Sequence, residues 1–120
     1  MPVENPRILT RNYGAAESWS IDTYERNGGY QSLRKALAMG PEKIRDEVKA
    51  ANLRGRGGAG FPAGMKWAFL KAHPEKPSYI AVNADEGEPG TFKDRLLMEL
   101  DPHRCIEGFI IAAYALDVHT

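Results

Sequence analysis

The 120-residue sequence predicts an α/β fold of several helices around a short strand. Apolar residues recur at helical spacing in five segments, and one other segment is short, β-branched and aromatic. A glycine-rich stretch and an acidic stretch interrupt these segments. With only one strand predicted, we expect most of the sheet to lie in sequence outside this chain. The domain is therefore expected to be incomplete as given.

The first part of the chain is expected to be an arm followed by two helices. Residues 1–27 have weak periodicity, which favours an extended N-terminal arm. Residues 30–39 place apolar side chains on one helical face. Gly40 can end that helix, and Pro41 can begin a second helix that runs to about residue 51.

The middle of the chain alternates helix and strand. Residues 63–72 predict a third helix, which proline-containing segments close. Residues 78–82 (SYIAV) predict a buried strand of the parallel type. A polar loop over residues 83–90 follows that strand directly.

Two further helices are expected after the polar loop. Thr91 is a good N-cap for a helix over residues 92–100. Asp101 can cap a final helix that Pro102 begins and that extends to about residue 116. The sequence ends four residues later, which we interpret as truncation.

Composition excludes several classes of protein. Sixteen basic residues balance sixteen acidic ones, so a general nucleic-acid or membrane-surface binder is not expected. Cys105 is the single cysteine, so the chain can form neither an internal disulfide nor a cysteine-ligated cluster alone. Residues 1–20 contain no signal-peptide pattern, and the longest apolar stretch, residues 109–116, is too short to span a bilayer. These features predict a soluble protein of the cytoplasmic side.

Residues 54–64 (RGRGGAGFPAG), the glycine loop, hold five glycines. Residues 55–60 match G-x-G-x-x-G, but a helix is predicted before them where the dinucleotide fingerprint needs a strand. Glycines let backbone N–H groups approach a phosphate, and Lys66 on the following helix can reach back toward it. We therefore predict an anion or flat-ligand site, with a purely structural turn as the alternative.

Residues 83–90 (NADEGEPG), the acidic loop, combine Asn83 with three carboxylates, Asp85, Glu86 and Glu88. Ligands of α/β sheets bind at the carboxyl ends of strands, where this loop is predicted to lie. Carboxylates repel phosphates, so the loop should hold the nitrogen-rich ring of a ligand whose phosphate lies at the glycine loop. A solvated turn and a divalent metal site are the alternatives, although the spacing lacks an EF-hand pattern.

Phe61 lies within the glycine loop, and Phe69 lies on the predicted helix after it. Either ring could stack on an adenine, and Phe61 is the better candidate because a core residue is unexpected there. The three histidines, at positions 73, 103 and 119, do not cluster in sequence. We therefore assign no metal site and no catalytic triad to this chain.

Taken as a pair, the two loops resemble the signatures of one family. The segments RGRGGAGFPAGMKW at 54–67 and NADEGEPGTFKDR at 83–95 are similar to those of the NADH-binding, FMN-carrying flavoprotein subunit of complex I, the NADH:quinone oxidoreductase. GGYQSLRKAL at 28–37 and LRGRGG at 53–58 fit the same family. The resemblance covers residues 7–120. Diaphorase subunits of NAD-reducing hydrogenases and NAD-linked formate dehydrogenases share both motifs.

The resemblance implies that residues 28–120 are the N-terminal part of a Rossmann-like FMN- and NADH-binding domain. A ubiquitin-like domain and a helical domain with a [4Fe–4S] cluster would belong to the missing C-terminal part. The implied activity is hydride transfer from NADH to FMN, after which electrons pass to iron–sulfur clusters and quinone. A chain of 120 residues alone would not perform electron transfer to a cluster. A diaphorase subunit and a non-catalytic nucleotide-binding fragment remain the alternatives.

The resemblance also implies roles for individual residues, with no side-chain nucleophile. Residues implied to bind NADH are Gly55, Arg56, Gly57, Gly58, Ala59, Gly60, Phe61, Gly64, Phe69, Glu86 and Glu88. Residues implied to bind FMN are Gly55, Gly57, Lys66, Asn83 and Asp85. Implied partners are other peripheral-arm subunits, notably the thioredoxin-like [2Fe–2S] subunit, with no nucleic acid and no membrane insertion. The implied location is the cytoplasmic side of the inner membrane.

Overall fold

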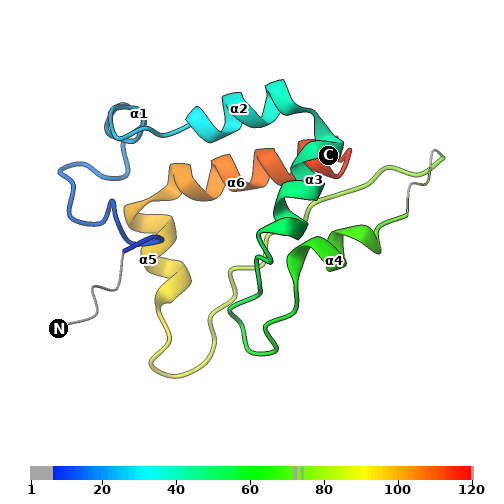
Figure 1. Cartoon of the computed structure of the whole chain (residues 1–120). Helices are drawn as coiled ribbons and strands as arrows, with labels where there is room; N and C mark the ends of the chain where they lie inside the picture. Colours follow the sequence, from blue (N-terminus) through cyan, green and yellow to red (C-terminus); the bar gives the residue numbers. More distant parts are fainter. Residues whose placement is uncertain (1–6, 72, 74, 120) are drawn as a thin grey trace, which may run out of the picture. The chain divides into compact units, whose positions relative to one another are not determined.

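The computed structural model describes residues 7–71, 73 and 75–119 (Figure 1). Within these residues the regular structure is helical, and no helix is both long and apolar enough to cross a membrane. The helices are α1 (Ile21–Arg26), α2 (Gln31–Met39), α3 (Pro41–Ala50), α4 (Ala63–Ala68), α5 (Lys93–Leu100) and α6 (Pro102–Ala115).

The chain divides into two units that are each discontinuous in sequence. The first unit combines the described part of Met1–Gln31 with Val82–Glu107, and so holds α1, α5 and the first turns of α6. The second unit combines Ser32–Ala81 with the described part of Gly108–Thr120. The acidic loop therefore belongs to the first unit and the glycine loop to the second.

The second unit has a small apolar core between its helices. Ala36 of α2, Ile44 of α3 and Ala115 of α6 are buried together. Trp67 of α4 is among the half-buried side chains that pack against them. Arg45 donates a hydrogen bond of 2.6 Å to the carbonyl oxygen of Ala115, which satisfies an unpaired carbonyl at the end of α6.

Helices α3 and α4 pack closely, and Gly64 makes this possible (Figure 1). Gly64 is buried at the start of α4. A Cβ atom at this position would lie 2.6 Å from the Cα atom of Lys49 on α3. Because that neighbour is backbone, it could not give way as a flexible side chain would. The glycine loop is therefore held to α3 by a contact between backbones.

The first unit is held by hydrogen bonds to two buried carboxylates. Asn12 and Arg104 both donate to Oδ2 of Asp101, at 2.9 and 3.0 Å, and Asp101 is fully buried. The hydroxyl of Tyr24 donates to Glu107 at 2.9 Å. Burial, followed by that hydrogen bond, raises the pKa of Tyr24, so the phenol stays a donor. These bonds tie the N-terminal segment to α6.

The structure confirms most of the predicted helices. Helices α2, α3 and α6 lie within the segments predicted for them, and Pro102 begins α6 as expected. Gly40, with a φ of 90°, separates α2 from α3, because only glycine adopts this conformation without strain.

Three local predictions are wrong. Part of the expected arm, residues 21–26, forms the helix α1. The third helix ends at Ala68, where the prediction had extended it to residue 72, which lies outside the described residues. The N-cap of α5 is Phe92 and not Thr91. The last error arises because a side chain from outside the helix, Glu86, caps α5.

The predicted strand over residues 78–82 is also wrong. This segment forms neither strand nor helix, and within the described residues the only β pairing is an isolated bridge between Arg54 and Pro62. Tyr79 and Val82 are exposed, with 65% and 54% of their surface accessible. A strand needs a neighbouring strand for its backbone hydrogen bonds, and no described segment supplies one. The described residues are therefore helical and not α/β.

Candidate functional site

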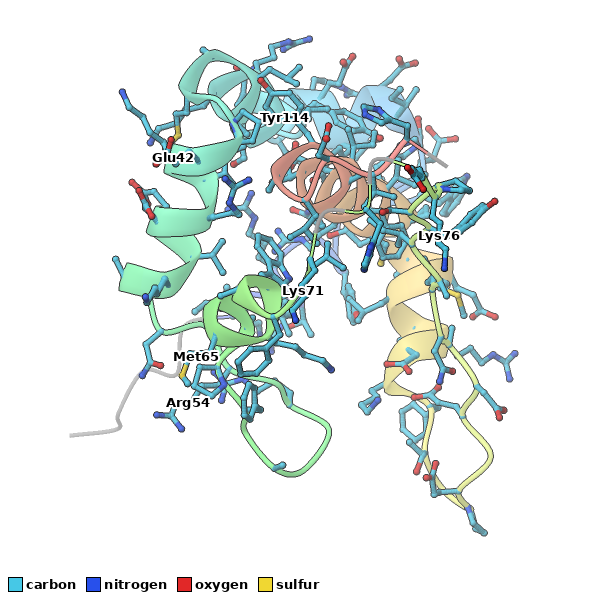
Figure 2. All side chains as sticks on the ribbon, turned by 90° about the vertical axis from the view of Figure 1, so that its right-hand side faces the viewer. Glu42, Arg54, Met65, Lys71, Lys76 and Tyr114 are labelled. Carbon is cyan, nitrogen blue, oxygen red and sulfur yellow. The ribbon has the colours of Figure 1, made fainter. Side chains whose placement is uncertain are left out.

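The glycine loop closes on itself at its base. The backbone N–H of Gly55 donates to the carbonyl of Phe61 at 3.0 Å, and that of Ala63 donates to Leu53 at 2.7 Å. The guanidinium of Arg54 also donates to the carbonyl of Gly60, at 3.3 Å. Figure 2 shows Arg54 and Met65 near the base of this loop. These contacts fix the two ends of the loop and leave its tip free.

The tip of the glycine loop presents backbone N–H groups and open space. Residues 56–60 donate none of their backbone N–H groups to an acceptor in the described part of the chain. A Cβ atom added at Gly57, Gly58 or Gly60 would meet nothing within 4 Å. Gly58 has a φ of 137°, which a residue with a side chain rarely adopts. Such a cluster of unpaired N–H donors can bind an anion or the edge of a polar ring.

Two aromatic rings, one before the start of α4 and one just after its end, lie beside each other. The centroids of Phe61 and Phe69 are 6.2 Å apart, with their planes inclined by 47°. Both side chains are exposed, Phe61 at 45% and Phe69 at 65%. Exposed aromatic rings offer flat apolar surfaces to a ligand ring. Lys66 lies in α4 between them in sequence and is exposed.

The acidic loop begins with a side-chain turn. The Oδ1 atom of Asn83 accepts a hydrogen bond of 3.0 Å from the backbone N–H of Asp85, a local pattern typical of Asn. The backbone N–H of Thr91 donates to the carbonyl of Glu88 at 3.2 Å and closes a second turn. The side chains of Asp85 and Glu88 are exposed between these turns. The loop therefore displays two carboxylates to solvent.

The side chain of Glu86 binds the start of α5 and is not displayed to solvent. Its Oε2 atom accepts from the backbone N–H of Asp94 at 2.8 Å, and its Oε1 atom accepts from that of Arg95 at 3.1 Å. Lys93 places its ammonium 3.6 Å from the same carboxylate, whose side chain is only 10% exposed. Of the three carboxylates in the loop, Glu86 is thus the one bound to the protein.

Sequence reasoning missed the part that Lys93 plays. The position of Lys93 at the start of a helix suits a solvated side chain, but its ammonium pairs with Asp94 at 2.9 Å and lies near Glu86. The hydrogen bond to Asp94 raises the pKa of Lys93, and the charges of Asp94 and Glu86 add to this effect. A cation in the first turn of a helix opposes the helix dipole, and the carboxylates of Asp94 and Glu86 offset that charge.

The structure groups the predicted site residues by loop. The glycine loop gathers its donors and two aromatic rings in the second unit, and the acidic loop gathers its amide and carboxylates in the first. Gly64 is buried against Lys49, and Glu86 is half-buried and binds two N–H groups of α5. The other predicted positions are exposed, except Gly60, which is half-buried. No group of three or more His, Cys, Asp and Glu side chains in the described residues is arranged to hold a metal ion.

Comparison with known proteins gives a consistent picture. Residues 48–120 match the model of the Nuo51 FMN-binding domain. A subunit of the NADH-quinone oxidoreductase of Rhizobium meliloti (strain 1021) is 54% identical over 114 residues, which are 94% of this chain and 27% of the relative. The corresponding subunit in Aquifex aeolicus (strain VF5) is 60% identical over 97 residues, 81% of this chain and 22% of the relative. This chain thus spans about a quarter of the length of these relatives.

Proposed function

Because this chain belongs to the family of the Nuo51 FMN-binding domain, we propose that it forms part of the FMN and NADH site of an NADH-quinone oxidoreductase. In this proposal it is the N-terminal part of the NADH-oxidising flavoprotein subunit. The relatives from Rhizobium meliloti and Aquifex aeolicus carry the names of subunits of that enzyme, which favours it over the diaphorase and non-catalytic alternatives.

The geometry of the glycine-loop tip is the observation that carries the proposal. Five consecutive residues, 56–60, offer N–H groups that no described acceptor uses, around glycines with open space beside them. FMN has a phosphate and a polar ring edge, and both need donors at close approach. The donor set of the loop therefore fits the cofactor of the family. In the ligand-free chain these accessible N–H groups bind water, which a phosphate or a polar ring edge can replace.

The residue roles are proposed as follows. Backbone groups of the glycine loop hold the cofactors, Phe61 and Phe69 stack on the adenine of NADH, and Lys66 contacts the flavin. Asn83 and Asp85 hold FMN, and Glu88 bonds the carboxamide of the nicotinamide. The full set on the NADH side is Gly55, Arg56, Gly57, Gly58, Ala59, Gly60, Phe61, Phe69 and Glu88. Gly64 and Glu86, which the resemblance also implies, serve this side by attaching the two loops to their helices.

The chain's own groups bind and orient, and they supply no nucleophile. When bound, FMN supplies the redox chemistry that takes the two electrons of a hydride from NADH and releases them one at a time to iron–sulfur clusters. The exposed carboxylates of the acidic loop would face the nitrogen-rich rings, and the donors of the glycine loop would face the anionic parts. We propose a Rossmann-like domain completed by further sequence, preceded by a segment over residues 1–27 that includes α1. We propose also docking to the [2Fe–2S] subunit on the cytoplasmic side of the membrane.

Loss of flavin tests the role of Lys66. We expect Lys66→Ala to weaken FMN binding about tenfold, since a hydrogen bond from a charged group contributes roughly 1.5–3 kcal/mol. Quenching of flavin fluorescence measures the affinity. Lys35→Ala, an exposed lysine of α2, is the matched control and should bind FMN as the unaltered chain does. Equal FMN affinity in Lys66→Ala and Lys35→Ala would contradict the assignment.

Glu88→Gln tests the nicotinamide end of the site. In the subunit assembled with its cluster-bearing partners, we expect it to slow NADH oxidation while FMN is retained. Glu99→Gln, an exposed glutamate of α5, is the matched control. Normal NADH kinetics in Glu88→Gln would remove Glu88 from the site.

Joint protection tests whether both loops serve one ligand. Added FMN should slow amide hydrogen exchange at residues 56–60 and at residues 83–88 with the same concentration dependence. Protection of one loop alone would show that the acidic loop and the glycine loop do not share the ligand. Absence of protection in both loops would refute FMN binding by this chain.

A further inference from the structure

Helix α5 lacks a cap from its own N-cap residue. Phe92 occupies that position and makes no side-chain cap hydrogen bond, because it has no polar atom in its side chain. The first N–H groups of a helix have no partner within the helix, and an acceptor from a cap residue normally binds the second or third of them. Asp94 and Arg95 are the second and third residues of α5.

Glu86 performs this capping from six residues before Phe92. Its two carboxylate oxygens bind one N–H each, Oε2 that of Asp94 and Oε1 that of Arg95. Both bonds are charge-assisted, and the negative charge lies at the positive end of the helix dipole. An 8-residue helix that begins with a lysine needs such a partner, because the charge of Lys93 opposes the dipole.

The cap also closes the acidic loop into a ring. Glu86 lies in the middle of the loop, so its attachment to α5 fixes the loop at its centre. The turn made by Asn83 lies on one side of this attachment, and the turn between Glu88 and Thr91 lies on the other. With the centre and both sides fixed, the carboxylates of Asp85 and Glu88 remain exposed at set positions.

We propose that Glu86 is a positioning residue, which anchors the acidic loop on α5 so that its neighbours face the flavin and the nicotinamide. This inference rests on the proposed function for the identity of the ligand, but the anchor itself is a property of the ligand-free chain. Glu86 is engaged through both oxygens, and its side chain is 10% exposed. Little of this side chain is therefore left accessible to a ligand.

Amide hydrogen exchange in the ligand-free chain tests the anchor. In Glu86→Ala we expect exchange about tenfold faster at Asp94 and Arg95, which lose their acceptor, and at Thr91, whose turn the anchor holds. Glu86→Gln keeps one oxygen acceptor and should give an intermediate increase. Glu88→Gln is the matched control and should leave these amides unchanged. Unchanged exchange in Glu86→Ala would overturn the proposal.

A second cap separates positioning of the loop from simple support of the helix. In Glu86→Ala with Phe92→Asp, the new aspartate sits at the N-cap and can bind the N–H of Asp94 or Arg95. We expect protection of these two amides to return, while exchange at Thr91 stays fast and FMN affinity stays about tenfold below that of the unaltered chain. Recovery of FMN affinity together with the helix would reduce Glu86 to a helix cap and overturn the positioning role.

FMN affinity distinguishes the failure of this inference from failure of the proposed function. If the unaltered chain binds FMN while Glu86→Ala loses affinity with no change in ligand-free exchange, Glu86 contacts the ligand directly and the positioning role is wrong. If the loop loosens in Glu86→Ala but the unaltered chain does not bind FMN, the anchor is supported and the proposed function is wrong.

Discussion

The glycine loop and the acidic loop are held in place by opposite means. The glycine loop is anchored by shape, since the missing side chain of Gly64 lets α4 approach the backbone of Lys49. The acidic loop is anchored by charge, since the carboxylate of Glu86 binds two N–H groups of α5. In each loop, one residue that resembles a ligand contact in sequence is used to attach the loop to a helix.

The difference shows that each loop uses some residues for attachment to a helix and leaves others accessible to solvent. Gly57 and Gly58 have open space around them, and Glu88 is exposed, so these positions are available to a ligand. Gly64 and Glu86 are buried or nearly so. Residues of the same type within one motif thus have different physical roles, and burial distinguishes them. Substitutions at matched pairs can test this division.

The largest effect is expected from a side chain added at the shape-based anchor. Gly64→Ala places a Cβ 2.6 Å from the Cα of Lys49, and such overpacking should cost about 2 kcal/mol of unfolding free energy or more. Alanine favours a helix over glycine by only about 1 kcal/mol, so the clash dominates. Thermal and denaturant unfolding measure the change. A Gly64→Ala variant as stable as the unaltered chain would show that α3 and α4 separate without cost.

Gly57→Ala is the matched control for this substitution. Its Cβ would meet nothing within 4 Å, so stability should change by less than about 0.5 kcal/mol. FMN affinity should nevertheless fall, because the methyl group would occupy space proposed for the cofactor. A stability loss as large in Gly57→Ala as in Gly64→Ala would remove the distinction between attachment and recognition in the glycine loop.

The single cysteine reports on the charge-based anchor. Burial, and next the charge of Asp101, raise the pKa of the Cys105 thiol, and the charge of Asp94 in the first turn of α5 contributes to the shift. The thiolate is the reactive form, so alkylation at pH 8 should be slower than for a free cysteine. Glu86→Ala should loosen α5, lower the thiol pKa toward its ordinary value and speed alkylation about threefold or more.

Mass spectrometry after timed alkylation measures this rate. Gly64→Ala alters the other unit and should leave the early rate at Cys105 unchanged under conditions where the chain stays folded. The rate in denaturant sets the upper limit. Equal acceleration by both substitutions would mean that the two anchors are not independent.

A smaller effect on stability is expected at the exposed aromatic pair. Phe61→Ala and Phe69→Ala each remove a ring that is largely accessible, so each should cost about 1 kcal/mol or less. The free energy of NADH binding should weaken by more than the free energy of unfolding does, because stacking on the adenine is lost. Tyr79→Ala removes a ring as exposed as that of Phe69 and is the control for general loss of aromatic surface. Calorimetric titration with NADH would exclude the stacking role if all three variants bound alike.

The sequence predicted local features well, because local physics determines them. Apolar spacing with Gly40 and Pro41 predicted α2 and α3, and Pro102 predicted the start of α6. The strand over residues 78–82 failed because a strand depends on partner strands, which the segment's own composition does not supply. The strand propensity of residues 78–82 depends on their apolar and β-branched side chains, and it carries no information about a partner strand.

The same reasoning explains which site features the sequence could not predict. The motif indicated which loops matter, but both anchors depend on packing between elements. Gly64 meets Lys49, which is fifteen residues earlier, and Glu86 meets Asp94 across a turn. Thr91 was predicted as the cap of α5 because its residue type suits that position, but Glu86 supplies the cap from outside the helix. Tertiary contacts therefore override a local preference in both loops.

The smallest effect sharpens the description of the charge-based anchor. Lys93 lies 3.6 Å from Glu86, so the anchor could be an ion pair as well as a helix cap. Lys93 is exposed, so its pair with Glu86 is screened by solvent, and its charge also opposes the helix dipole. These two effects offset each other, so we expect Lys93→Gln to leave the midpoint of unfolding nearly unchanged. Thermal unfolding at low and high salt measures it, and a loss as large as that of Glu86→Ala would assign the anchor to the ion pair and not to the backbone N–H groups.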